Sequence, residues 1–269
     1  MAYKALTIAG SDSGGGAGIQ ADIKTFQELN VFGMSAITAV TAQNTLGVQG
    51  VHPIPAEFIA QQIDSVSSDI GVDALKTGML FSAEIIEVVA GKIKQYGWDK
   101  VIVDPVMIAK GGSPLLQKEA VSALKKYLLP ITYIVTPNIP EAEELTGMII
   151  KTDNDKLEAA KILMDLGVKY VIIKGGHDVQ LNESTDLLYD GSNTFTFTEE
   201  RFQTKNTHGT GCTFSAAITA GIAKGLSVFE AVSVAKEFIS VAIKQDLHIG
   251  NGNGPTNHWA YKSKEGITL

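Results

Sequence analysis

The sequence contains a single cysteine, Cys212, among its 269 residues. One thiol cannot form an internal disulfide, and it cannot supply a zinc site that needs several thiolates. We therefore expect Cys212 to serve either in packing or in chemistry. The residues around it in the sequence have to decide between the two.

Positive charge and long apolar runs are also scarce. Lys and Arg together number 22 against 29 Asp and Glu, so the formal net charge is -7 and no basic surface for nucleic acid is expected. No apolar stretch is long enough to span a bilayer, and the start MAYKALTIAGSD has no charged segment leading into an apolar run. We expect no nucleic-acid partner, no membrane association and a cytoplasmic location.

Two common nucleotide-binding patterns are missing from the first glycine-rich segment, GSDSGGGAGIQAD at residues 10–22. It matches the dinucleotide fingerprint only loosely, because a polar insert precedes the glycines and the following TAVTAQNT supplies no acid for a ribose. It is not a Walker-type loop, since no lysine followed by Ser or Thr comes after the glycines. We expect either a flexible functional loop carrying Asp12 and Asp22 or a plain surface turn.

Short β-branched runs alternate with amphipathic stretches of helical length, which is typical of a mainly parallel sheet covered by helices. The expected strands are residues 4–9, 35–41, 72–76, 100–104, 133–136 and 169–174. The expected helices are residues 17–29, 56–70, 83–96, 117–128, 156–166, 210–224 and 228–245. The Asp190-Gly191 dipeptide between residues 186–189 and 194–198 predicts a hairpin, and so an antiparallel edge. We expect one α/β domain over residues 1–269.

The second glycine-rich segment, NTHGTGCT at residues 206–213, leads into the helical stretch FSAAITAGIAKG. Backbone N–H groups at such a helix start attract phosphate, and Gly209 and Gly211 allow close approach. Cys212 falls in the first turn, where the positive helix end favours a thiolate that could take a proton from an alcohol. The alternative is an inert packing cysteine beside an ordinary helix cap.

Polar residues follow three later strands, at the edge where α/β proteins usually bind ligands. Asp104 ends one strand, and Asn138 and Glu141 follow the next about one helical turn apart. Their oxygens suit magnesium held together with nucleotide phosphates. Lys174 ends a further strand beside two glycines, where its ammonium could reach phosphate. Taken singly, each residue could also be a cap or a solvated charge.

The motifs GSDSGGGAGIQAD, TAVTAQNTLGV, KTGML, VDPVM, TPNIPEAEEL, VIIKGGH and NTHGTGCTFSAA follow one another over nearly the whole chain. In this order they resemble the bacterial hydroxymethylpyrimidine/phosphomethylpyrimidine kinases of thiamine biosynthesis, within the ribokinase-like superfamily. The resemblance implies a three-layer α/β/α sandwich, usually a homodimer. It also implies that ATP and Mg²⁺ are used to phosphorylate the pyrimidine alcohol and then its monophosphate.

The resemblance also implies a role for each matching residue. Gln43 looks like the group that hydrogen-bonds the aminopyrimidine edge, with Ala17, Met79, Val106 and Asp22 on the same substrate side. Gly209, Thr210 and Gly211 resemble the anion hole and Cys212 the base. The nucleotide side is implied to comprise Lys174, Asn138, Thr207 and His208, with Asp104 and Glu141 at the metal.

Three other functions stay open on the sequence alone. A pyridoxine or pyridoxal kinase shares the fold, although the AQNT pattern at residues 42–45 favours the pyrimidine. A sugar kinase would usually carry aspartate in place of Cys212, and a non-catalytic pyrimidine-binding protein would not need the thiol and Lys174 together.

Lys110-Gly111-Gly112 is either a mobile flap over the phosphates or an exposed turn.

Overall fold

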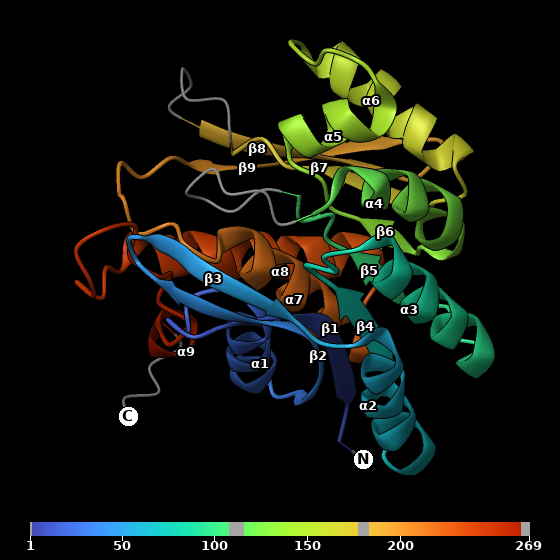
Figure 1. Cartoon of the computed structure of the whole chain (residues 1–269). Helices are drawn as coiled ribbons and strands as arrows, with labels where there is room; N and C mark the ends of the chain where they lie inside the picture. The colour runs from blue at the N-terminus through green and yellow to red at the C-terminus, as the bar shows by residue number, and fades with distance from the viewer. Residues whose placement is uncertain (1, 108–115, 177–182, 265–269) are drawn as a thin grey trace.

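Within the described residues 2–107, 116–176 and 183–264 of the computed structural model, nine strands form one sheet. Its order is β3-β2-β1-β4-β5-β6-β7-β8-β9 (Figure 1). The six central strands, β2, β1, β4, β5, β6 and β7, pair in parallel. At the two edges, β3, β8 and β9 pair antiparallel. The strands are β1 Lys4–Asp12, β2 Phe32–Asn44, β3 Gly47–Pro53, β4 Ala74–Thr77, β5 Val101–Val103, β6 Ile134–Val135, β7 Tyr170–Ile173, β8 Glu183–Tyr189 and β9 Thr194–Glu200.

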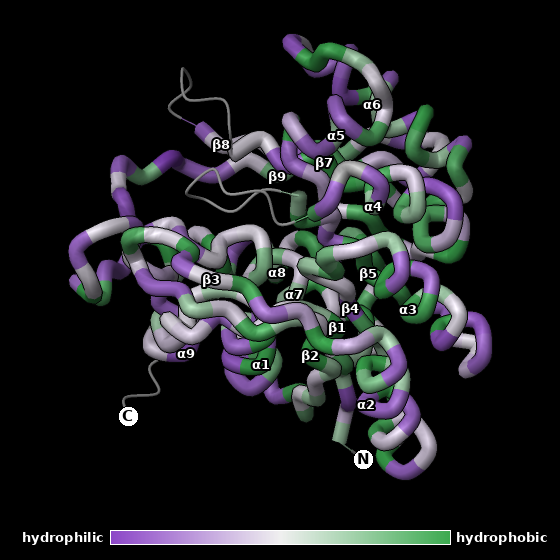
Figure 2. The backbone as a smooth tube through the Cα atoms, viewed as in Figure 1, coloured by the Kyte–Doolittle hydropathy of each residue, from purple (hydrophilic) through white to green (hydrophobic). Residues whose placement is uncertain are grey.

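Helices cover both faces of the sheet, which makes the three-layer α/β/α sandwich that the sequence predicted (Figure 1). The helices are α1 Gly18–Glu28, α2 Ala56–Asp69, α3 Ala83–Tyr96, α4 Lys118–Ala123, α5 Ile139–Thr146, α6 Asp153–Asp165, α7 Thr210–Ala223, α8 Val228–Lys244 and α9 Ala260–Lys264. Buried side chains form two apolar clusters, one under α2 to α6 and one under α1, α7 and α8. Because both faces of the central strands are covered, β4 and β5 are buried throughout, and β5 is entirely apolar. Figure 2 shows the hydropathy of each residue along the backbone.

The predicted hairpin is present as β8 and β9, but its turn is longer than a two-residue turn. Residues 190–193 connect the strands, and the Asp190 side chain accepts hydrogen bonds from the backbone N–H groups of Ser192 and Asn193. Gly191 has a φ of 96°, which suits glycine. The aspartate therefore organises this turn through its side chain as well as through its backbone preference.

Three described elements were absent from the expectations drawn from the sequence: strand β3, helix α5 and the short helix α9. Strand β3 was missed because Gly47 and Gly50 interrupt its pattern, although it pairs with the extended end of β2. Helix α5 was missed because it is only eight residues long and carries Pro140 in its first turn. The segment after α4 was predicted as one helix, but it continues as a wider π-helical turn, Leu124–Leu128, and a 3-10 turn, Leu129–Ile131. Lys110-Gly111-Gly112 lies outside the described residues.

The segment after α8 folds back against the start of α7. Backbone hydrogen bonds join His208 to Gly254 and Thr256, and the buried His258 ring lies 3.0 Å from the Thr213 hydroxyl. This segment therefore helps to hold the beginning of α7 in place. Among the described helices, none combines the length and apolar character needed to cross a bilayer.

His258 should make stability depend on acid. Burial, with a smaller effect of Lys24, lowers the pKa of His258 from 6.5 to about 4. Between these values the unfolded chain binds the extra proton, so stability is complete above pH 6.5 and falls as the pH drops toward 4. We expect a loss of up to about 3 kcal/mol from this group.

The measurement is urea unfolding from pH 7 to pH 4 for the wild type and His258→Gln, which keeps a polar partner for Thr213. The variant should show the smaller loss of stability on acidification. His248→Gln, at a ring whose side chain is 86% exposed, is the control and should behave as the wild type. Equal slopes for His258→Gln and the wild type would contradict the prediction.

Candidate active site

The start of α7 lies at the carboxyl edge of the sheet and is shaped by glycine. Gly209 is the N-cap residue with a φ of 82°, and a Cβ there would meet the carbonyl oxygen of Gly16 in the first loop. Only glycine combines this left-handed backbone with such close approach. The two glycine-rich loops predicted from the sequence are therefore packed directly against each other. The helix presents its first backbone N–H groups at this junction, as an anion site requires.

Lys174 joins two carboxylates from neighbouring strand ends. Its ammonium lies 2.8 Å from Asp104 Oδ1 and 3.8 Å from Glu141 Oε2. A Cβ at Gly211 would lie 3.5 Å from Lys174 Nζ, so the first turn of α7 borders this cluster. Burial acts to lower the pKa of Lys174, but Asp104 and Glu141 outweigh it and raise the pKa above its usual value. Lys174 is therefore a fixed positive charge beside the proposed phosphate site.

Asn138 and Glu141 form a helix cap, which the sequence left open as an alternative to metal binding. Asn138 Oδ1 accepts from the Glu141 backbone N–H, and Glu141 Oε2 accepts from the Asn138 N–H, which is a capping box at the start of α5. Burial raises the pKa of Glu141 to about 7 although Lys174 opposes the shift. The capping box uses Oε2 of Glu141, so Oε1 could still bind a cation.

Asp22 does not lie where a substrate-contacting residue was expected. It is fully buried, with one carboxylate oxygen 2.7 Å from Lys76 Nζ and the other 2.6 Å from the Thr7 hydroxyl. Lys76, which the sequence interpretation did not single out, is also fully buried and donates to the Cys212 carbonyl oxygen at 3.3 Å. Both carboxylate oxygens of Asp22 are thus bonded inside the core, and a contact with substrate stays a prediction.

The expectation of an acidic thiol at Cys212 is corrected. The residue lies in the first turn of α7 and is partly exposed. Burial of the sulfur, helped by Asp22 and Asp104, nevertheless raises the pKa of Cys212 to about 12, although Lys76 and the Gly18 backbone act to lower it. The thiolate loses more solvation free energy on burial than it gains from the backbone dipoles at the start of the helix.

The expected substrate-side residues come from segments that end at the carboxyl edge of the sheet. The Gln43 amide nitrogen lies 3.3 Å from His208 Nε2, and Ala17 directly precedes α1. Met79 is buried after β4, where its Cε fills the space beside Gly10. Val106 is partly exposed after the adjacent strand β5. Residues from four separate segments are thus brought to one edge of the sheet.

His208 faces the substrate-side residues and not the nucleotide-side cluster where it was expected. Its Nε2 lies 2.8 Å from Asp12 Oδ2 and close to Gln43, whereas Thr207 accepts a hydrogen bond from the Thr210 hydroxyl. Asp12 was expected only as part of a loop, and it is almost completely buried. No sequence signal predicted this contact, because residues 12 and 208 are nearly 200 positions apart.

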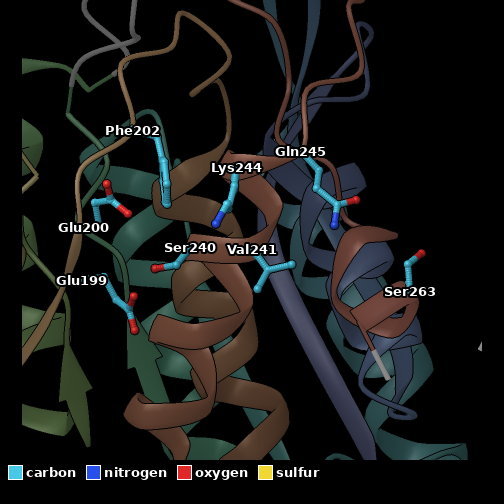
Figure 3. A pocket seen from close by; sticks show the side chains of 8 residues that line it. All are labelled: Glu199, Glu200, Phe202, Ser240, Val241, Lys244, Gln245 and Ser263. Carbon is cyan, nitrogen blue, oxygen red and sulfur yellow. The ribbon is translucent and has the colours of Figure 1, made fainter. Parts of the chain in front are cut away.

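A separate hollow lies between β9, α8 and α9, lined in part by Glu199, Lys244 and Ser263 (Figure 3). None of the predicted site residues borders it. Lys244 instead packs over the Phe202 ring at 5.4 Å. We assign the site to the carboxyl edge of the sheet, where the charged and polar groups converge.

Solved structures similar to this chain include pyridoxal kinases. The chain is similar to a Bacillus subtilis pyridoxal kinase in an ADP complex, with a TM-score of 0.91 and 47% identity over 97% of this chain and 99% of that one. It is also similar to a Staphylococcus aureus pyridoxal kinase in complex with AMP-PCP and pyridoxal, with a TM-score of 0.90 and 42% identity over 97% and 95%. The fold and the site define a ribokinase-like small-molecule kinase.

Sequence comparison identifies the family within this class of small-molecule kinases. The family model described as phosphomethylpyrimidine kinase matches residues 12–257. A Bacillus subtilis (strain 168) relative named hydroxymethylpyrimidine/phosphomethylpyrimidine kinase is 62% identical over 260 residues, covering 97% of this chain and 96% of the relative. The chain belongs to the phosphomethylpyrimidine kinase family, which confirms the resemblance drawn from its motifs.

Proposed function

We propose that this protein transfers a phosphoryl group from ATP to hydroxymethylpyrimidine and then to the resulting monophosphate, in thiamine biosynthesis. One observation carries the proposal: the loop from His208 to Cys212 joins the substrate side to the phosphate side. His208 lies beside Gln43, while the Gly211 position lies beside Lys174. An alcohol held by Gln43 would therefore meet the helix start where a phosphoryl group is stabilised.

Within this proposal each group has a chemical task. The Gln43 amide offers an acceptor for an exocyclic amine and a donor for the adjacent ring nitrogen. Ala17, Met79 and Val106 form walls around the ring. The backbone of Gly209, Thr210 and Gly211 stabilises the transferred phosphoryl group. Cys212 first loses its own proton to solvent, and the thiolate then accepts the alcohol proton. Lys174, Asn138 and Thr207 lie on the nucleotide side, and a homodimer remains part of the proposal.

The residues present also fit Mg²⁺ held with ATP phosphates. Among the described residues, no group of three or more His, Cys, Asp or Glu side chains could hold a metal ion alone. Asp104 and Glu141 supply two carboxylates, and phosphate and water oxygens would complete the shell that Mg²⁺ prefers. When bound, Mg²⁺ would neutralise phosphate charge. Burial raises the pKa of Glu141 to about 7, and a bound cation would favour its ionised form.

The direct test is phosphorus NMR of a reaction containing the purified protein, ATP, Mg²⁺ and hydroxymethylpyrimidine. We expect the pyrimidine monophosphate first and the diphosphate afterwards. Gln43→Leu should lower kcat/KM about 10- to 100-fold, because ring polar atoms lose their partners. Tight pyrimidine binding without phosphorylated product would overturn the proposal in favour of a non-catalytic binding protein.

Pyridoxal kinase activity is the second candidate, and the two similar pyridoxal kinase structures favour keeping it. Pyridoxal also carries a hydroxymethyl group on a heteroaromatic ring, so the same Cys212 and anion loop could serve it. We expect kcat/KM to be higher for the pyrimidine, because the Gln43 amide matches an amine next to a ring nitrogen. A higher value for pyridoxal would reverse the assignment.

A further inference from the structure

Asp12 is a buried carboxylate committed to hydrogen-bond donors. It is 2% exposed, and it accepts the backbone N–H groups of Gly14 at 2.8 Å, Gly16 at 3.0 Å and Ala17 at 2.8 Å. Burial acts to raise its pKa, but His208 and the backbone donors outweigh burial and hold the pKa of Asp12 below its usual value. The carboxylate is therefore ionised near neutral pH and has no proton to give.

This fixes which atom of His208 carries a hydrogen. Its Nε2 lies 2.8 Å from Asp12 Oδ2, and an ionised carboxylate can only accept. The hydrogen must therefore be on Nε2, which leaves that nitrogen without a lone pair. The backbone of His208 is held by Gly254 and Thr256, so the ring starts from a fixed position.

The same nitrogen lies 3.3 Å from the terminal amide of Gln43. If the amide nitrogen faced it, two donors would oppose each other. On its other side the amide lies 3.2 Å from the Thr41 hydroxyl, whose single proton already has an acceptor in the Ser11 carbonyl oxygen at 2.8 Å. Turning the amide so that its oxygen faces His208 and its nitrogen faces Thr41 resolves both conflicts.

We propose that Asp12 and His208 are positioning residues that lock the orientation of the Gln43 amide and so set which heteroaromatic edge the kinase accepts. The locked amide shows its acceptor on the His208 side and its donor on the Thr41 side. That order fits a ring amine next to an unprotonated ring nitrogen. It does not fit the reverse order, in which an oxo group lies next to a ring N–H, because acceptor would then face acceptor and donor would face donor. This inference rests on the proposed pyrimidine kinase function.

The test compares kcat/KM for hydroxymethylpyrimidine and for the analogue with an oxo group in place of the amine. The wild type should prefer the amine by at least about 100-fold. His208→Ala frees the amide to rotate, so the preference should fall to within about 10-fold. His208→Gln places an amide nitrogen near the former Nε2, can donate to both Asp12 and Gln43, and should keep the preference. The exposed His248→Ala is the matched control.

The outcomes separate the two levels of the proposal. A wild type that phosphorylates neither compound overturns the pyrimidine kinase function. If the wild type is active and His208→Ala keeps the amine preference, only the positioning role is overturned. The ratio of the two kcat/KM values is the readout because general damage to the site would lower both values without changing their ratio. If His208→Ala fails to fold, nitrogen NMR of the unaltered protein decides. A hydrogen on His208 Nε2 supports the lock, and a bare Nε2 overturns it.

Discussion

Cys212→Ala is expected to fold normally and to lose about 100- to 10,000-fold in kcat, the usual contribution of a positioned acid or base. Alanine is compatible with the first turn of α7, which is already rich in small residues. Because burial raises its pKa, the resting thiol is protonated, and it has to lose this proton before it can accept one from the alcohol. Steady-state kinetics at saturating ATP and pyrimidine, with circular dichroism for folding, gives the answer.

Two further variants at the same position sharpen the result. Cys212→Ser keeps the shape but replaces the thiol by a weaker acid, so it should stay close to the alanine variant. Cys212→Asp, which installs the residue usual in ribokinase-like sugar kinases, should recover part of the activity because a carboxylate can accept the proton. Near-normal turnover of Cys212→Ala would show that Cys212 is not the base, and that the anion loop and Lys174 suffice for catalysis.

Lys76→Met is expected to lower the free energy of unfolding by about 3–5 kcal/mol, because it leaves the Asp22 carboxylate buried without its partner. Both side chains are fully buried, and the ammonium also holds the Cys212 carbonyl oxygen. Burial acts to lower the pKa of Lys76, but Asp22, Cys212 and Asp104 outweigh it and keep the lysine charged. Denaturant unfolding at neutral pH measures the loss.

The double variant Lys76→Met with Asp22→Asn removes both charges and should recover much of the stability lost in the single variant. Lys92→Met is the matched control, because its pair with Asp64 is partly exposed, with the two side chains 18% and 41% accessible. Exposed pairs contribute about 0–1 kcal/mol, so Lys92→Met should change little. A Lys76→Met variant as stable as the control would show that Asp22 is not left unpaired.

The local elements of the fold could be predicted from the sequence because their signals are local. Alternating apolar runs placed the strands and most helices within a few residues, and the Asp190-Gly191 pair located the β8–β9 hairpin. Where the prediction of an element failed, the local signal was weak. Glycines interrupt β3, and α5 is short and carries Pro140 in its first turn.

The sequence by itself determined the α/β class, the glycine-rich start of α7, the strand-end positions of Asp104 and Lys174, and the family. Only the tertiary structure decided that Asp22 is paired with Lys76 in the core, that His208 faces Asp12 and Gln43, and that the Cys212 thiol has a raised pKa. These properties depend on burial and on charges brought together from distant segments. Neither quantity can be read along the chain, because both arise when the sheet and its helices exclude water.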